Sequence, residues 1–484
     1  MIRTPLENAA CAALALLIGA QAARARPEQG PAPAGGSSSP SDRGPRPEIE
    51  LASSLQRRGL PFSAFFHYAR IVEAGPTHPD YLEAVQGTAS TGEVLGDQVF
   101  APNILRKAYG DSFVRLPPDV RSQIDYAVAL LAYRAGDLAE ATRRLEGVGP
   151  GAAAFARARL LQGLLAQRGQ PEKAIEILRW VLRLGDQGPY RDLPGLREIA
   201  RLNLGRTFYG LHRYAEASAE YAAVPRFSRH WDEALFEGAY ADLKKGDKGS
   251  ALGRLHGLHS PHLSDEFAPE SENLAAIIYF QNCLYPQVRE AVKRFEARYL
   301  PMRDQMKALL DPDPPLSAWV ALLHGTPGLP SPVRRHLLKN ERIDSMLGYL
   351  ARLDDEAARV EAAGELPPGV ARSDLREILA SQRALAVQVA GKFIRGRLLD
   401  LAHLIDVLDR EKEIIAFETA KGEKALLEGN VDVRETLSRQ RLSRPEMPTT
   451  GHEYWPFDGE YWPDEIGYYK YTLKNACPGT PKDD

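Results

Sequence analysis

The chain has 484 residues, of which 44% are hydrophobic and 26% are charged. This composition is typical of packed globular proteins, and the length leaves room for roughly two or three domains. With 61 basic and 64 acidic residues, the formal net charge is -3. The balance gives no overall attraction to nucleic acid, so no nucleic-acid partner is expected.

The first 25 residues are predicted to be a secretory signal peptide. Arg3 precedes an apolar run from Cys11 to Ala20, and two A-x-A cleavage sites end at Ala22 and Ala25. The apolar run is too short to span a bilayer comfortably, which favours cleavage. Glu7 weakens the basic start of the signal, so an uncleaved N-terminal anchor remains the alternative.

Residues 26–55 are predicted to be a disordered linker. The stretch from Arg26 to Glu48 is rich in Pro, Gly and Ser. Such a stretch cannot bury enough apolar surface to offset its chain entropy. We therefore expect a spacer between the signal and the first helix.

Export also affects the interpretation of the cysteines. Removal of the signal leaves Cys283 and Cys477, an even pair for an oxidising compartment. A disulfide between them would stabilise the fold by about 4 to 5 kcal/mol in the chain-entropy model. Two separate buried thiols are the alternative, because free cysteine is among the most buried residue types.

Residues 56–300 are predicted to form repeated helical hairpins. The best copy has small and aromatic residues at the signature positions of the tetratricopeptide repeat. These positions are Gly205, Phe208, Tyr214, Ala217 and Tyr221. The small residues let two antiparallel helices approach, and the aromatic residues fill the volume on either side.

Weaker copies have turns at Gly136–Asp137, Gly169–Pro171 and Gly246–Asp247. Their key alanines are roughly 33 to 43 residues apart, whereas a strict array would keep about 34. One hairpin cannot cover its own apolar faces, so stacking into an α-solenoid is expected. Other types of α-solenoid remain open at this stage.

Residues 301–440 are predicted to be helical, with a long antiparallel hairpin. Its first helix has coiled-coil spacing. The residues at that spacing are Ile343, Met346, Leu350, Leu353, Ala357 and Val360. A capping box at Asp374 and Glu377 is expected to start the second helix, which continues toward Leu427 with Gly391 and Gly396 as weak points. Two arrangements stay open: the hairpin projects from the repeats, or the repeats cover it.

Residues 441–484 form a tail in which Glu-Tyr-Trp-Pro occurs twice. Its candidate docking aromatics are Tyr454, Trp455, Tyr461 and Trp462. Aromatic side chains bury much area for little lost entropy, which favours docking of the tail in the groove of its own chain. Binding to a partner is the alternative, because Trp and Tyr are enriched in interface hot spots.

We find no catalytic motif, and neither an enzyme activity nor a cofactor is expected. Three histidines, His256, His259 and His262, have a spacing that can hold a metal ion on one helix face. Gly257 and Pro261 are expected to break that helix, so we predict loop and capping roles and no metal site.

Several segments together resemble periplasmic tetratricopeptide proteins of the myxobacterial adventurous gliding motility machinery. They are Ala251–Pro261, Phe267–Glu270, Ile278–Tyr285, Ile415–Lys424 and Gly459–Tyr469. The resemblance implies a structural component of a multiprotein envelope machine, with no catalytic residues. Some of those proteins are lipoproteins, and this chain departs from them because Cys11 opens its apolar run.

Two functions are therefore expected. The first is a periplasmic scaffold that binds envelope proteins, with peripheral membrane association only through those partners. The alternative is an accessory binding protein for outer-membrane assembly or cell-wall processing.

Overall fold

The computed structural model describes residues 47–185, 188–190, 192–323, 328–368, 370–428, 459–473 and 475–477. Over these residues it contains eighteen α-helices, two short 3-10 helices and no strand, which confirms the all-α prediction. The predicted signal peptide (residues 1–25) lies outside the described residues, as do Tyr454 and Trp455.

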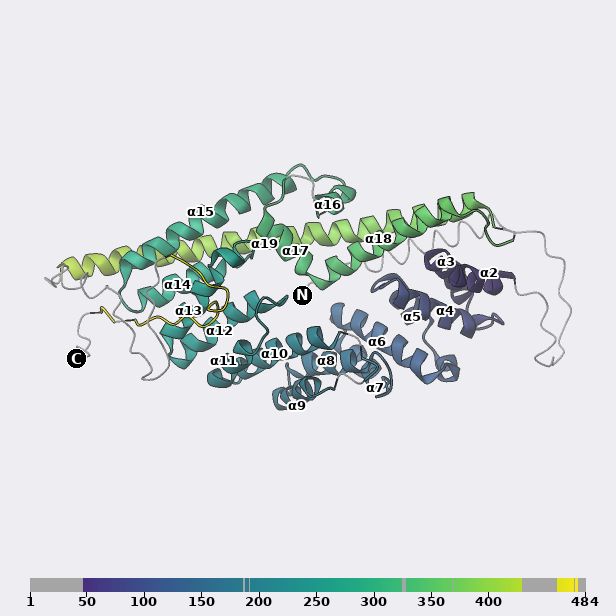
Figure 1. The fold of residues 1–484 in the computed structure, drawn as a ribbon, viewed down its shortest axis with the longest axis horizontal. Helices are drawn as coiled ribbons and strands as arrows, with labels where there is room; N and C mark the ends of the chain where they lie inside the picture. Colours follow the sequence, from purple (N-terminus) through teal and green to yellow (C-terminus); the bar gives the residue numbers. More distant parts are fainter. Residues whose placement is uncertain are drawn as a thin grey trace.

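The helices from α2 to α14 follow one another along a curved row, called the helix row below (Figure 1). Consecutive helices pack against each other through most of it, for example α2 with α3, α6 with α7 and α12 with α13. The bounds are α2 Pro47–Arg57, α3 Pro61–Ala74, α4 Tyr81–Val94, α5 Phe100–Ala108, η1 Asp111–Arg115, α6 Pro118–Arg134, α7 Leu138–Glu146, α8 Phe155–Ala166, α9 Pro171–Leu182, α10 Leu193–Gly210, α11 Tyr214–Ala222, α12 Trp231–Lys245, α13 Lys248–Leu258, η2 Pro261–Leu263 and α14 Glu270–Phe280.

Two glycine–aspartate pairs form turns of the row at positions that the sequence predicts. Gly136 and Gly246 have positive φ values of 80° and 93°, which glycine adopts at no steric cost just after a helix. The aspartate that follows each glycine then caps the next helix. Asp137 accepts a hydrogen bond from the Glu140 amide at 3.1 Å, and Asp247 accepts one from the Ser250 amide at 2.9 Å.

The second half of the chain lies along one side of the row. Its helices are α15 Tyr285–Leu310, α16 Leu316–Leu323, α17 Ser331–Lys339, α18 Glu341–Ala362 and α19 Arg372–Glu428. The predicted boundary between residues 300 and 301 lies inside α15, which continues through Pro301. The boundary is therefore not a break in the structure.

Helix α19 connects the two ends of the helix row (Figure 1). It has 57 residues, which corresponds to a length of about 85 Å. It packs against α3 and α18 in its N-terminal part and against α14 and α15 in its C-terminal part. The predicted seam on α18, including Met346 and Leu350, is buried, and both α18 and α19 also contact α3 of the row.

Two predicted boundaries differ from the structure. Helix α2 begins at Pro47, inside the predicted linker, because proline is compatible with a first turn and Ile49 is buried. Helix α19 begins at Arg372, so Asp374 lies in its first turn and is not its N-cap. Arg372 and Ser373, which precede the predicted start, therefore belong to the helix.

Candidate functional site

The repeat-signature residues lie together where α10 packs against α11. A Cβ atom on Gly205 would come within 2.7 Å of the Tyr221 ring, so only glycine permits this contact. Ala217 is fully buried beside them. Phe208 is also buried, with the Arg213 guanidinium 4.6 Å from its ring centre. These residues hold two helices together and leave no polar group free for chemistry.

Tyr214 has a different position from the other signature residues. It is only half-buried, and its hydroxyl lies 2.7 Å from Nδ1 of His212. The Tyr209 ring meets it edge to face at 5.3 Å. Tyr214 therefore closes the turn between the two helices and does not fill their interface.

The tail crosses α13 over three glycines spaced four residues apart. A Cβ atom on Gly253 would lie 1.7 Å from the Tyr469 carbonyl oxygen, and one on Gly249 would lie 2.1 Å from the Tyr471 carbonyl oxygen. Gly257 similarly faces Gly467 at 3.2 Å. Residues four apart share one face of a helix, so α13 presents a bare backbone strip to the tail. We call this strip the glycine face.

Three tail tyrosines surround His256, which also lies on α13. The Tyr461 ring stacks on the imidazole at 4.8 Å, and the Tyr469 ring meets it edge to face at 4.8 Å. The Tyr471 hydroxyl lies 2.9 Å from His256 Nδ1. Burial lowers the pKa of His256 to about 4, and the neighbouring His259 adds to the effect. The ring is therefore neutral at physiological pH.

The aromatic residues of the tail differ in how deeply they are buried. Tyr461 docks on the chain itself, whereas Trp462 is 54% exposed. Within the described part of the tail, Ile466 is fully buried and packs in an apolar cluster with residues of α8 to α13. The sequence analysis did not single out Ile466, and it gave His256 a loop or capping role instead of a place in the tail contact. The only signal for them is the glycine spacing on α13, which is visible in the sequence.

Cys283 and Cys477 form a disulfide that fixes the end of the tail to the turn after α14. Their Cα atoms are 5.1 Å apart, and the bond joins residues 194 positions apart in the sequence. The Ala476 amide also donates to the Asn282 carbonyl at 3.0 Å. The tail is therefore held by a covalent bond at one end and by the glycine face before it.

Docking of the tail is expected to weaken in acid. An undocked histidine binds a proton below about pH 6.5, whereas docked His256 resists protonation down to about pH 4. The docked state therefore has its full stability above pH 6.5 and loses it as the pH falls toward 4. The Tyr471 amide donates to the Gly249 carbonyl at 3.1 Å. Its protection factor, the exchange rate corrected for the intrinsic rate at each pH, should fall over this range. The same pH dependence in His256→Phe would contradict this assignment.

A serine–histidine–glutamate group near α14 resembles a catalytic triad but has different geometry. The fully buried Ser271 hydroxyl donates to the Ala268 carbonyl at 2.6 Å. His259 Nε2 lies 2.8 Å from Ser271 Oγ, so this nitrogen donates to the serine and cannot act as its base. Glu272 approaches the same nitrogen at 3.8 Å instead of the opposite one. The group is a buried structural network.

The remaining member of the histidine set points elsewhere. His262 Nε2 lies 3.2 Å from the Tyr461 carbonyl oxygen. His256 and His262 thus both contact Tyr461, one through its ring and the other through its carbonyl oxygen, whereas His259 contacts Ser271. Across the described ranges, no three His, Cys, Asp or Glu side chains are grouped to hold a metal ion. Helix α13 continues through Gly257 to Leu258, so the predicted break at Gly257 was wrong and the helix ends just after it.

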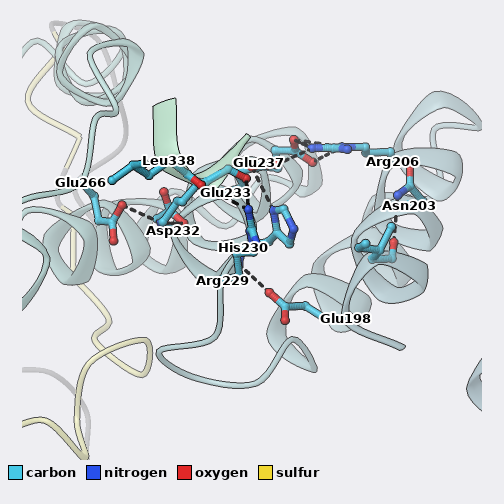
Figure 2. A network of polar contacts seen from close by, with 12 residues as sticks. Glu198, Asn203, Arg206, Arg229, His230, Asp232, Glu233, Glu237, Glu266 and Leu338 are labelled. Carbon is cyan, nitrogen blue, oxygen red and sulfur yellow. Dashed lines mark hydrogen bonds and ion pairs between the residues drawn. The ribbon is translucent and has the colours of Figure 1, made fainter. Parts of the chain in front are cut away.

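A polar network ties the middle of the helix row to α17 and α18 (Figure 2). Arg229 donates to the Lys339 carbonyl at 2.7 Å, at the C-terminal end of α17, where a cation complements the helix dipole. The Lys339 ammonium reaches back to Asp232 at 2.8 Å and to Glu266 at 2.6 Å. Burial and the nearby Asp232 raise the pKa of Glu266.

The network continues into the helix row (Figure 2). Glu198 accepts from the His230 amide at 2.5 Å, just before α12. Burial tends to raise the pKa of Glu233, but hydrogen bonds and charge from His230 and Arg206 lower it to about 2. The sequence gives no signal for these contacts, because the residues of the network come from α10, α12, α17 and the turns before α12 and α14.

One hollow lies between the helix row and the start of α18. Its volume is about 270 Å³. Small apolar side chains of α4, α5, α6 and the turn before α8 form much of its wall, including Ala101, Ala127 and Ala153. Charged residues also line it, namely Glu93, Asp97, Asp119, Arg157 and Glu341.

Comparison with known proteins identifies no function for the chain, so a function has to be argued from the structure. No family model matches the chain, and no curated protein matches it. In the part of the chain that the structure describes, no helix is long and apolar enough to cross a membrane. The hollow and the docked tail are therefore the features on which a function can be argued.

Proposed function

We propose that the protein is a non-catalytic tetratricopeptide-type scaffold of the periplasm that binds other proteins of an envelope complex. Stacked helical hairpins joined at Gly–Asp turns support the repeat type. The Cys283–Cys477 bond fits an oxidising compartment. The resemblance to gliding motility proteins suggests the kind of complex. One of the segments that carry this resemblance, Gly459–Tyr469, belongs to the tail that docks on α13.

The hollow is the observation that carries the binding role. It has an alanine-rich wall and lies beside a turn of the row that α18 holds in place. The Ser345 hydroxyl donates to the Gly96 carbonyl at 3.0 Å, and the Arg352 guanidinium donates to the Leu95 carbonyl at 2.7 Å. These bonds from α18 hold the turn between α4 and α5 in place. A preformed wall costs little conformational entropy when a ligand binds.

The charges around the hollow indicate the chemistry of the ligand. Glu93, Asp119 and Glu341 contribute carboxylates, and Glu341 lies 4.0 Å from the Arg134 guanidinium. Arg157 contributes a positive charge to the wall and lies 5.0 Å from the Tyr126 ring centre. The excess of carboxylates favours a positively charged ligand. A segment of a partner protein with an apolar side chain next to lysine or arginine fits both the wall and the rim.

The test is affinity capture from crosslinked envelopes with two tryptophan variants. Ala127→Trp fills the hollow, whereas Ala219→Trp places the same side chain on the exposed face of α11. We expect the wild type and Ala219→Trp to recover the same inner-membrane, periplasmic and outer-membrane proteins, and Ala127→Trp to lose them. Circular dichroism and thermal unfolding check that both variants fold.

Two results would overturn the scaffold proposal. Equal recovery by Ala127→Trp would remove the hollow as the binding site. Recovery of only peptidoglycan or unfolded outer-membrane proteins would favour the alternative of an accessory protein for cell-wall processing or outer-membrane assembly.

A further inference from the structure

The described part of the tail, residues 459–473 and 475–477, forms a strap across successive parts of the helix row. Near its start, the Arg226 guanidinium in the turn before α12 donates to the Asp464 carbonyl oxygen at 2.5 Å. The strap then crosses the glycine face, where the Tyr471 amide donates to the Gly249 carbonyl oxygen. It ends at the turn after α14, where the disulfide lies. One segment therefore links the turn before α12 to the turn after α14.

Most of the strap remains at the surface. Among its described residues, only Ile466 and Ala476 are buried, and the other side chains are partly or largely exposed. Ordering an extended segment costs backbone entropy at every residue, whereas two buried side chains return little free energy. The noncovalent contacts are therefore a weak hold, and the disulfide supplies a large share of the docking.

Helix α13 depends on the strap for cover. It has eleven residues, of which three are glycines, and these three form the glycine face. Glycine is the least favourable residue inside a helix after proline, because its backbone loses the most freedom and is exposed to water. The carbonyl groups of Tyr469 and Tyr471 lie directly on this strip. Removing the strap would expose the strip to water, so α13 would open more often.

The disulfide at the end of the strap lies at the surface. Cys283 and Cys477 are each only partly buried. Gln281 and Asn475, two residues before each of them, are exposed. Exposed disulfides are the more labile kind, because a thiol can reach a sulfur atom without unfolding of the chain. A dissolved dithiol therefore has access to this bond in the folded protein.

We propose that the Cys283–Cys477 bond is a redox-controlled latch for the strap. While the bond is intact, the strap covers the glycine face. When a dithiol reduces the bond, the strap leaves the glycine face and α13 becomes dynamic. The dithiol supplies two electrons and two protons, so the sulfur–sulfur bond breaks, both cysteines become thiols, and the dithiol closes into a disulfide. A disulfide oxidant such as oxidised glutathione reverses the step. This inference is independent of what the hollow binds.

Hydrogen exchange of the folded full-length chain tests the latch. Exchange is followed by mass spectrometry before and after treatment with dithiothreitol at constant pH, and alkylation of the thiols shows that the bond has been reduced. We expect peptides that cover α13 to lose protection several-fold on reduction, whereas peptides that cover α3 keep theirs. Reoxidation with oxidised glutathione should restore the original exchange.

Two variants separate the bond from the other contacts of the strap. Cys477→Ser cannot form the bond, so its α13 should exchange at the reduced rate with or without dithiothreitol. Thr472→Ser is the matched control, because Thr472 is an exposed residue of the strap and the bond is retained. This control should respond to dithiothreitol as the wild type does. Circular dichroism checks that both variants fold.

Three outcomes would overturn the proposal. The first is a bond that dithiothreitol reduces only after the chain is unfolded in urea. The second is unchanged exchange of α13 after reduction, because the noncovalent contacts would then hold the strap by themselves. The third is an equal loss of protection in α3, because reduction would then destabilise the whole chain instead of releasing the strap.

Discussion

Replacing Glu356 by alanine is expected to lower the free energy of unfolding by about 3 kcal/mol or more. Glu356 lies on α18 and is fully buried. Its two carboxylate oxygens accept from the amides of Phe62 and Ser63, each at 2.8 Å, and one of them also accepts from the Ser63 hydroxyl at 2.7 Å. These donors belong to the first turn of α3, where Leu60 supplies no capping side chain.

Glu356 therefore caps a helix that precedes it by almost three hundred residues in the sequence. Alanine would leave two buried amides and a hydroxyl without acceptors, and each unsatisfied group costs about 1 to 3 kcal/mol. Urea unfolding measures the change. Glu361→Ala is the matched control on the same helix, because Glu361 pairs with Arg376 at the surface, and its unfolding midpoint should not change. Equal effects of the two variants would contradict the capping role.

The charge of Glu356 also predicts a dependence on pH. Burial raises the pKa of Glu356 above 4.5, and its hydrogen bonds only partly offset that effect. The folded state therefore holds the proton more tightly than the unfolded state does. The stability from this group is present below about pH 4.5 and is lost as the pH rises through the folded-state pKa. Glu356→Gln should lack this pH-dependent loss.

Two glycines of α19 are expected to respond in opposite directions to the same substitution. Gly391→Ala should lower the free energy of unfolding by about 2 kcal/mol or more, because overpacking against a backbone cannot relax easily. The added Cβ atom would lie 2.0 Å from the Leu316 carbonyl oxygen, where α16 crosses α19. Gly396→Ala should raise the free energy of unfolding by about 0.5 to 1 kcal/mol, because its Cβ position is open and alanine favours helix.

The comparison between these variants separates helix propensity from packing. Both positions lie inside one helix, so propensity alone predicts stabilisation at each of them. Thermal and urea unfolding of the two variants would measure the difference. Stabilisation by Gly391→Ala would mean that α16 does not approach α19 as closely as described.

Local patterns in the sequence predict most of the helices. Proline and glycine–aspartate pairs predict the turns, because each residue type acts on its own backbone. The three- and four-residue spacing from Ile343 to Val360 predicts α18, and the same kind of spacing predicts α19, since a helix buries one face whatever it packs against. The start of α19 was less predictable, because Asp374 fits a cap and a first turn almost equally well.

The sequence by itself therefore determined an all-helical chain, its turns and the two cysteines available for a bond. Only the tertiary structure decided that α19 connects both ends of the helix row, that Glu356 caps α3 and that His256 receives the tail tyrosines. These contacts join residues far apart in the chain, and their energy depends on burial and distance in three dimensions. A charged or aromatic side chain looks the same in the sequence whether it faces water or a distant helix, which is why these contacts could not be predicted.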